Sequence, residues 1–405
     1  MSLFNSQLST LNSPLIPPGY KQTEVGVIPE DWDVKPLGKC LSGRPSYGIN
    51  AAAVPYSDNL PVYIRITDIS EDGRFSPDKL VSVNSELSGN YYLSDGDIVF
   101  ARTGASVGKS YRYDPNDGPL VFAGFLIRAR PDVEKLLPDF ATAYVTTGNY
   151  WRWVRLMSMR SGQPGINGNE YSQLPIPVPP VPEQRAIATA LSDVDGLLGG
   201  LDRLIAKKRD LKQAAMQQLL TCQTRLPGFH GEWEVKRLGD VVRITKGQLI
   251  TEGTAIPGAI PVIAGGKKPA YFHNKPNRAG KTVTISASGA SAGYVAFFDE
   301  PIFASDCSTI CESGDYSIEF VYFQLQLKQA TIYKAQTGGA QPHIHAAEIN
   351  PIEFFWPTVP EQTAIAEVLT DMDAELAALE QRREKTRALK QAMMQELLTG
   401  KIRLL

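Results

Sequence analysis

The sequence has no apolar run near the roughly 18 residues that a membrane-spanning helix needs, and no basic-then-apolar leader begins it. We therefore expect a cytoplasmic protein that makes no membrane contact. Cysteines number only four, Cys40, Cys222, Cys307 and Cys311, and they are too scattered for a disulfide scaffold. The net charge of −2 gives no whole-protein argument for nucleic-acid binding, so any such argument must be local.

A long internal repeat dominates what is present. Residues 181–226 align with residues 359–404 without a gap, and 25 of these 46 positions are identical. Each copy begins Val-Pro-Glu-Gln, and a proline followed by an acid suits the first turn of a helix. Apolar residues then recur at steps of three and four, which is the coiled-coil pattern. We predict two helices of about 38 residues, each roughly 57 Å long.

The obvious partner for each helix is its own copy, and we predict an antiparallel coiled coil whose apolar seam slips by one residue around Leu211 and Leu389. Residues assigned to this pairing or to a partner protein are Glu183, Gln184, Ile187, Leu191, Val194, Leu198, Leu201, Leu211, Leu219, Glu361, Gln362, Ile365, Leu369, Met372, Leu376, Leu379, Leu389 and Leu397.

The repeat also includes the globular segments that precede each helix. The opening Trp32-Asp33-Val34-Lys35-Pro36-Leu37-Gly38 returns as Trp233-Glu234-Val235-Lys236-Arg237-Leu238-Gly239. Short β-rich runs follow at 62–66, 97–100, 241–244, 261–263 and 281–285, and one closing helix is expected near 138–154 and another near 318–333. The predicted fold is α+β: two similar globular domains separated by two long repeat helices, with pseudo-two-fold symmetry. Predicted boundaries are an arm at 1–25, domains at 26–180 and 227–357, and helical segments at 181–226 and 358–405.

Three patterns could suggest catalysis or a cofactor. Residues 104–110 are one residue short of a phosphate loop, and their counterpart at 289–294 has no lysine, so a glycine turn that approaches a DNA phosphate is favoured. Cys307, Cys311, His343 and His345 match no standard zinc spacing and have no equivalents in the first half. No Ser/His/Asp set or carboxylate pair recurs in both halves. We therefore predict neither an enzyme nor a metal site.

Positive charge is local rather than global. Between Lys246 and Lys281 there are six bases and a single acid, and in the first half arginines accompany Trp151 and Trp153. Basic faces with Gly, Ser and Gln nearby suit phosphate contacts together with base reading. Predicted DNA-binding residues are Arg65, Thr67, Arg102, Ser106, Lys109, Arg112, Arg160, Gln163, Asn167, Lys246, Lys267, Lys268, Lys281, Ser288, Ser291, Gln336, Gln341 and His343.

The repeated Val-Pro-Glu-Gln and Leu-Lys-Gln-Ala-x-Met-Gln-x-Leu-Leu-Thr motifs, the Trp-x-Val-Lys-x-Leu-Gly openings and the expected strand at 64–69 resemble the DNA-specificity subunit of type I restriction-modification systems. The resemblance covers nearly the whole chain from Gly26. It implies two target recognition domains that each read half of a split site in double-stranded DNA. It also implies that two methyltransferase (modification) subunits dock on the helices, with restriction subunits as further partners. S-adenosylmethionine and ATP would belong to those partners, and this chain would carry no cofactor.

One departure is that Gly196, Gly199 and Gly200 stand where the second helix has Ala374, Ala377 and Ala378. Glycine weakens a helix by about 1 kcal/mol relative to alanine, so the first helix is predicted to be softer.

A helix of this length corresponds to about 17 base-pair steps. It would act as a ruler that sets the gap between two short DNA recognition sequences, here called words. One helical turn added or removed after Leu211 should change the gap and leave both words. Arg65→Ala or Gln163→Ala should affect the first word, and Gln341→Ala the second. Open alternatives are a coiled-coil adaptor without DNA binding and a nucleotide-driven switch at 104–110. A fused enzyme is less favoured because the chain has no Asn-Pro-Pro-Tyr or Asp-Pro-Pro-Tyr loop.

Overall fold

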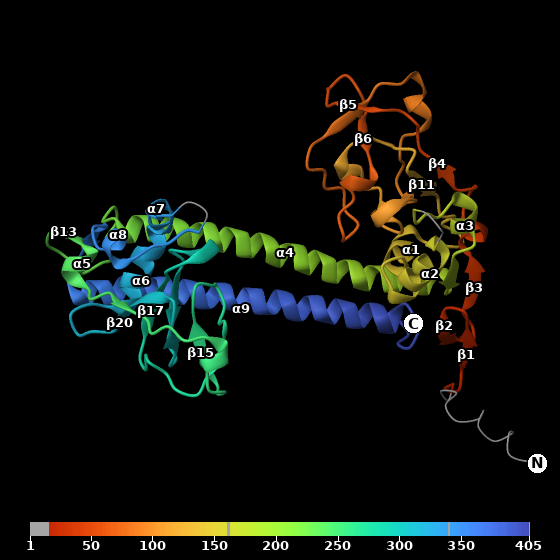
Figure 1. Cartoon of the computed structure of the whole chain (residues 1–405). Coiled ribbons are helices and arrows are strands. Elements are labelled where there is room, and N and C mark those ends of the chain that lie inside the picture. Colours follow the sequence, from red (N-terminus) through yellow and green to blue (C-terminus); the bar gives the residue numbers. More distant parts are fainter. Residues whose placement is uncertain (1–15, 160–162, 339–340, 405) are drawn as a thin grey trace, which may run out of the picture. The chain divides into compact units, whose positions relative to one another are not determined.

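The computed structural model describes residues 16–159, 163–338 and 341–404. The chain divides into two compact units, Met1–Gly199 with Glu384–Leu405, and Gly200–Arg383. Each unit contains one globular domain and part of both long helices, α4 (Val181–Leu220) and α9 (Val359–Leu397) (Figure 1). The mixed content of helices and strands confirms the predicted α+β class. In the described part of the chain, no helix combines the length and apolarity that crossing a bilayer requires.

The first domain is built on two four-stranded sheets. The antiparallel sheet has the order β4-β11-β8-β9, and the second sheet has the order β10-β6-β7-β5 with β10 parallel to β6. Two further pairs, β1-β2 and β12-β3, complete the strands. The strand bounds are β1 Tyr20–Thr23, β2 Gly26–Pro29, β3 Asp33–Pro36, β4 Ser46–Tyr47, β5 Ala53–Pro55, β6 Val62–Ile64, β7 Val81–Val83, β8 Ile98–Ala101, β9 Ser110–Arg112, β10 Leu120–Phe122, β11 Leu126–Ala129 and β12 Pro175–Val178.

The second domain repeats this plan in smaller form. Its antiparallel sheet has the order β14-β20-β17-β18, and a three-stranded sheet has the order β16-β15-β19 with β15 parallel to β19. The pair β13-β21 corresponds to β3-β12, so in each domain the strand before the long helix pairs with the strand after the opening tryptophan. The strand bounds are β13 Glu234–Arg237, β14 Thr245–Lys246, β15 Ile260–Ile263, β16 Tyr271–His273, β17 Thr282–Ser286, β18 Val295–Phe298, β19 Phe303–Ala304, β20 Cys307–Cys311 and β21 Glu353–Trp356.

The shorter helices correct several sequence-based expectations. Each expected closing helix is two helices, α1 with α2 and α6 with α7, and the first break coincides with Thr147, whose hydroxyl caps α2 by accepting from the Tyr150 N–H. The expected strand at 241–244 is wrong, because helix α5 ends at Val241 and β14 starts only at Thr245. The helix bounds are α1 Pro138–Tyr144, α2 Gly148–Ser158, α3 Gly168–Ser172, α5 Leu238–Val241, α6 Ile318–Leu327, α7 Gln329–Lys334 and α8 Ala346–Ile349.

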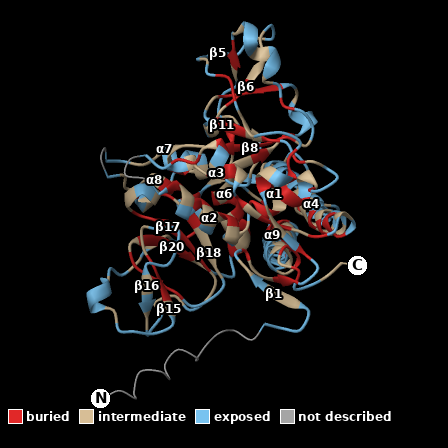
Figure 2. Ribbon diagram, turned by 90° about the vertical axis from the view of Figure 1, so that its right-hand side faces the viewer, coloured by how far each residue is buried: buried red, intermediate tan, exposed pale blue. Residues whose placement is uncertain are grey.

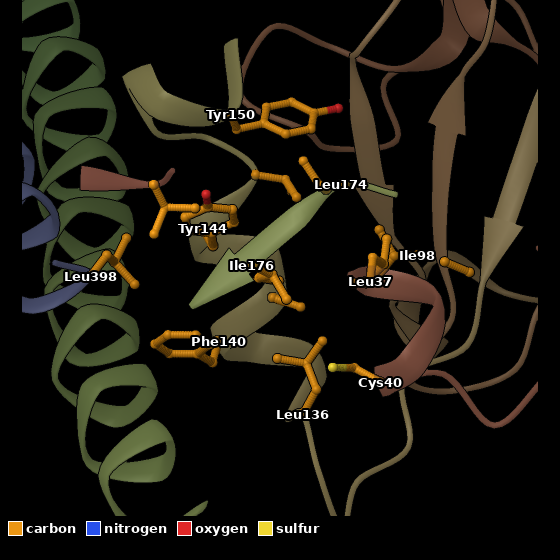
Figure 3. Packing of buried hydrophobic residues seen from close by; sticks show 14 of the residues in the cluster. Leu37, Cys40, Ile98, Leu136, Phe140, Tyr144, Tyr150, Leu174, Ile176 and Leu398 are labelled. Atoms are coloured by element: carbon orange, nitrogen blue, oxygen red, sulfur yellow. The ribbon is translucent and has the colours of Figure 1, made fainter. Parts of the chain in front are cut away.

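The main core of the first domain lies between its antiparallel sheet and its helices. Figure 3 shows Ile176 of β12 among Leu37, Phe140 and Tyr144, with Leu398, the residue after α9, in the same cluster. Burial is concentrated inside each domain, whereas the outward faces of α4 and α9 are exposed (Figure 2).

The two long helices pair antiparallel in each unit. In the unit of the first domain, Lys390 Nζ lies 2.6 Å from Asp195 Oδ1, and in the other unit Lys212 Nζ lies 2.6 Å from Asp373 Oδ1. These two ion pairs are the same contact after the 178-residue shift, because Lys212 corresponds to Lys390 and Asp195 to Asp373. The repeat in the sequence is therefore present in the ion pairs of the two units as well as in their apolar residues.

The predicted slip in the seam is wrong. The seven-residue spacing continues from Ile205 through Lys212 to Leu219, and the side chains of Lys208 and Lys212 reach across the seam to Glu375 and Asp373. Leu211 is 47% exposed and Leu389 56% exposed, so neither belongs to the helix pairing. The sequence indicated a false slip because lysines, not apolar residues, occupy two of the seam positions. A lysine can fill such a position with its methylene chain and still keep its charge near water. The other apolar seam residues are buried, namely Ile187, Leu191, Leu201, Leu219, Ile365, Leu369, Leu376 and Leu397, or half-buried, namely Val194, Leu198, Met372 and Leu379.

The Pro-Glu-Gln motif attaches each domain to its helix. Glu183 is fully buried, accepts from Trp32 Nε1 at 3.0 Å and receives both Nε and Nη2 of Arg403. In the other unit Glu361 accepts from Trp233 Nε1 at 3.1 Å and from two nitrogens of Arg225. A buried carboxylate is stable in such a place because bidentate guanidinium and indole donors saturate its oxygens.

The glutamine of the motif has an equally local role. The Gln184 amide oxygen accepts from the Leu137 N–H at 2.8 Å, and the Gln362 oxygen accepts from the Ser317 N–H at 3.0 Å. Both glutamines also donate to the carbonyl of a proline five residues earlier. Since Glu183, Gln184, Glu361 and Gln362 are buried against their own domains, assigning them to the coiled coil or to a partner surface was wrong.

We predict that Cys222→Gly stabilises the chain. Cys222 follows the end of α4 with φ of 61°, and the equivalent residue after α9 is Gly400 with φ of 67°. A Cβ in the left-handed region is unfavourable by about 1–2 kcal/mol, and the greater freedom of glycine in the unfolded chain offsets part of this. We expect a net gain of about 1 kcal/mol in the free energy of unfolding, measured by denaturant titration.

Gly400→Ala is the matched comparison for that prediction. It should destabilise the chain, because its φ is positive and a Cβ there would lie 2.5 Å from Pro29 Cδ. A Cys222→Gly chain that unfolds more easily than the wild type would contradict the account.

Candidate nucleic-acid interface

The Gly-Ala-Ser-x-Gly motif forms the same tight turn in both domains. In the first it is the 3-10 turn η4 (Gly104–Ser106) after β8, and in the second it is η7 (Gly289–Ser291) after β17. Both glycines of each motif have φ between 72° and 90°, a conformation that favours glycine. A strand follows each turn rather than a helix, so the nucleotide-binding reading of residues 104–110 is wrong: a phosphate loop must open a helix.

The glutamine-proline loop lies against this turn in each domain. The Gly104 N–H donates to the Pro164 carbonyl, and the Gly289 N–H donates to the Pro342 carbonyl, both at 3.0 Å. Two residues further along the loop, the Ile166 N–H donates to the Arg102 carbonyl, as the Ile344 N–H does to that of Ala287. We call this arrangement the turn–loop site. Its two segments are far apart in the sequence, and the fold joins them.

In the first domain the turn–loop site presents an arginine stacked on an aromatic ring. Arg102 Cζ lies 5.0 Å from the centroid of Tyr47, whose hydroxyl accepts from the Gly168 N–H at 3.0 Å. Gln163 is exposed, and its Nε2 lies beside Gly104. Exposed Phe125 is tied to the same site because its carbonyl accepts from the Arg102 N–H. Of the remaining predicted residues, Ser106 is in the turn, and Asn167 caps α3 by accepting from the Glu170 N–H.

In the second domain lysines replace the arginine. Lys267 Nζ lies 5.3 Å from the centroid of Tyr294, which follows the turn directly, and both Lys267 and Lys268 are exposed. Lys246 is exposed on edge strand β14, where it lies opposite Ser308 of β20. Ser308 in turn lies opposite Ile285, near the end of β17 that leads into the turn.

The other predicted side chains of this domain divide between free and engaged groups. Gln341 is exposed, whereas Gln336 donates to the Ala292 carbonyl and Ser288 donates to Asp306. His343 holds the loop through backbone bonds with Thr337, and Ser291 lies in the turn.

Four predicted DNA contacts lie elsewhere or are paired with acids. Arg112 and Lys281 are at the opposite end of β8 and β17 from the turn, where Arg112 pairs with Asp139 and Lys281 with Glu319, each at 2.6 Å. The hydrogen bond to Glu319 raises the pKa of Lys281, so the ammonium group stays charged, but that charge is already paired with a carboxylate. Lys109 pairs with Glu71 at 2.7 Å.

Arg65 also departs from its prediction. It lies after β6 in the second sheet, and its Nε and Nη2 both bind the buried Asp68. The expected strand at 64–69 is wrong, because residues Ile66–Asp68 form a 3-10 turn that leaves Thr67 exposed. Arg160 lies outside the described residues.

Tyr47, Phe125 and Tyr294 were missed by sequence reasoning. Tyr47 is on β4, and Phe125 is between β10 and β11, far along the chain from the turn they flank. Only the strand pairing brings them to one place. Among the described residues, no group of three or more His, Cys, Asp or Glu side chains could hold a metal ion.

Comparison with known proteins identifies the family. Residues 29–205 and 230–388 match the model of the type I restriction modification DNA specificity domain, once for each half. A putative type I restriction enzyme MjaX specificity subunit from Methanocaldococcus jannaschii is 26% identical, with 95% of this chain and 96% of that protein aligned. The MjaVIII specificity subunit of the same organism is 24% identical, with 93% and 94% aligned.

A solved structure shares the fold. The type I restriction-modification S subunit from M. genitalium superposes with a TM-score of 0.64 at 15% identity, covering 90% of this chain and 96% of that one. The family match spans well over half of the residues. The chain therefore belongs to the family of type I restriction-modification DNA-specificity subunits, and its role is DNA recognition rather than catalysis.

Proposed function

We propose that each turn–loop site reads one half of a bipartite target in double-stranded DNA. The observation that carries the proposal is a duplicated backbone frame with different side chains: the same two hydrogen bonds hold the site in each domain, but Arg102 is replaced by Ala287 and Lys109 by Tyr294. A constant frame with variable side chains suits two readers that recognise different words. Exposed glutamines at 163 and 341 can each pair with a base edge in the major groove.

Arg102 is the strongest candidate for direct base reading in the first domain. Arg65, Lys109 and Arg112 each bind a carboxylate, whereas among the described residues Arg102 has no ion-pair partner. Stacking on Tyr47 restrains its guanidinium, so less conformational freedom is lost on binding. A restrained arginine fork matches the two acceptors of guanine, O6 and N7. We propose that the first word contains a guanine opposite Arg102.

Lys246, Lys267 and Lys268 suit a different task in the second domain. Lysine is a compact charge that binds phosphate without fixing the identity of a base. Three exposed lysines near one turn would raise affinity for any duplex and make it salt-dependent. In this domain the word would then be read chiefly by Gln341.

The exposed faces of α4 and α9 support docking of two copies of one partner. Leu211, Gln213, Ala214 and Gln217 are exposed, and so are the identical residues at 389, 391, 392 and 395. Packing against the domains cannot explain these identities, because none of these side chains is buried. Two equal surfaces fit two equal subunits, and we propose that these are methyltransferase subunits. S-adenosylmethionine and ATP remain expected in the partners alone.

We further propose that the paired helices set the gap between the words. α4 has 40 residues and α9 has 39, so each is about 60 Å long at 1.5 Å per residue. Ion pairs between the helices resist sliding of one along the other, which favours a fixed gap.

Arg102→Ala tests the reading role. Methylation mapping with the cognate methyltransferase should show that one position of the first word becomes degenerate, with about 10- to 100-fold less discrimination there, and that the second word is unchanged. Arg112→Ala is the matched control, because Arg112 lies at the far end of the sheet, and both words should persist. Equal weakening at all sequences would make Arg102 a phosphate contact instead.

A further inference from the structure

Three glycines interrupt α4 where its pseudo-symmetric partner has alanines. Gly196, Gly199 and Gly200 correspond to Ala374, Ala377 and Ala378 of α9. Tight packing does not require glycine here, since a Cβ added at Gly196 or Gly200 would meet nothing within 4 Å. Both lie within a continuous helix. Because glycine gains most from leaving the helical conformation, this is the weakest stretch of α4 on intrinsic propensity.

A second, independent observation coincides with these glycines. The division of the chain into two compact units passes through α4 between Gly199 and Gly200. In α9 it passes between Arg383 and Glu384, where the seam positions are Arg383 and Thr386 rather than large apolar residues. Where the chain divides into its two units, one helix therefore has its lowest helix propensity and the other has a polar seam.

We propose that Gly196, Gly199 and Gly200 form a flexible joint in α4, and that this joint determines how strictly the gap between the two half-sites is enforced. One additional base pair moves a half-site by about 3.4 Å and turns it by roughly 35°. A stiff spacer rejects such a target. A jointed spacer accepts it, because bending and twisting at three glycines absorb part of the change. The proposal rests on the proposed reading of a bipartite target.

The test replaces all three glycines by alanine in the full chain and combines it with the cognate methyltransferase. Substrates are libraries that carry both words with the natural gap, or with gaps longer or shorter by one and two base pairs. Methylation at the natural gap should be retained within about twofold, whereas the ratio of off-length to natural-length methylation should fall about tenfold or more. That estimate follows from the roughly fivefold preference of a helix for each alanine over glycine.

The reverse substitution provides a matched variant. Ala374→Gly, Ala377→Gly and Ala378→Gly place the same three glycines at exposed positions of α9 and should broaden the gap profile. Hydrogen exchange of the amides at 196–204 gives a readout independent of DNA, and the alanine variant should slow exchange there.

The outcomes separate the two proposals. Slower exchange with an unchanged gap profile would overturn the joint as a specificity determinant and leave bipartite reading intact. A wild-type chain that directs no two-part motif would overturn the proposed function, and the role of the joint with it. A narrowed profile with both words preserved is the result expected of the joint.

Discussion

Leu211→Asp is expected to reduce the number of bound methyltransferase subunits, which we propose to be two, to one. Leu211 is exposed on α4, and its repeat counterpart Leu389 is exposed on α9. Full burial of a leucine side chain in an interface contributes about 1.5–3 kcal/mol, and an unpaired carboxylate in its place adds a desolvation penalty. We expect the affinity at that surface to fall by about 100-fold or more. Analytical ultracentrifugation or native mass spectrometry of the assembled complex measures the stoichiometry directly.

The chain offers a matched control for this substitution. Leu197 is also an exposed leucine of α4, at 43%, but its repeat counterpart is Glu375. Leu197→Asp adds the same charge to the same helix and should leave two subunits bound. Leu389→Asp should remove the other subunit, and the double variant Leu211→Asp, Leu389→Asp should remove both. Two subunits still bound to the double variant would show that docking uses another surface.

Lengthening both helices by one turn is expected to lengthen the gap and to preserve both words. The sequence suggested an insertion after Leu211 alone, but the ion pairs Lys212–Asp373 and Lys390–Asp195 fix the register of the two helices on both sides of their middle. An insertion in one helix alone would move the two residues of one ion pair out of register with each other. The same four residues, a copy of 376–379, should therefore be inserted after Arg203 in α4 and after Gln381 in α9.

The expected gap change follows from helix geometry. Four residues add about 6 Å of rise and about 40° of rotation beyond a full turn, against roughly 3.4 Å and 35° for one base pair. The gap should grow by one or two base pairs, and methylation at the original gap should fall about tenfold or more. Methylation mapping of a library with all gap lengths measures both. An insertion in α4 alone is the control and should lower activity at every gap. If the variant with both insertions methylated different words, the proposal that the helices set the gap while the domains read the words would be refuted.

The sequence alone determined the features that depend on nearby residues. The repeat of residues 181–226 defined two long helices, because apolar spacing and helix propensity act over a few turns. Gly104, Gly108, Gly289 and Gly293 marked two turns, because only glycine readily adopts their φ. The family resemblance, and with it the role in DNA recognition, also came from local motifs, and the comparisons confirm it. Those comparisons offer no support for an adaptor without DNA binding.

Tertiary structure alone decided which polar groups are available. The sequence assigned the motif glutamate to the helix pairing or to a partner, but it is buried and binds an arginine 220 residues away for Glu183 and 136 for Glu361. Strand register places Arg112 and Lys281, which the sequence predicted as DNA contacts, at the end of the sheet opposite the turn. Tyr47 joins Arg102 only because β4 and β8 both pair with β11. Periodicity and turn chemistry are local properties of a chain, whereas the partner of a charge is set by register and packing between distant segments.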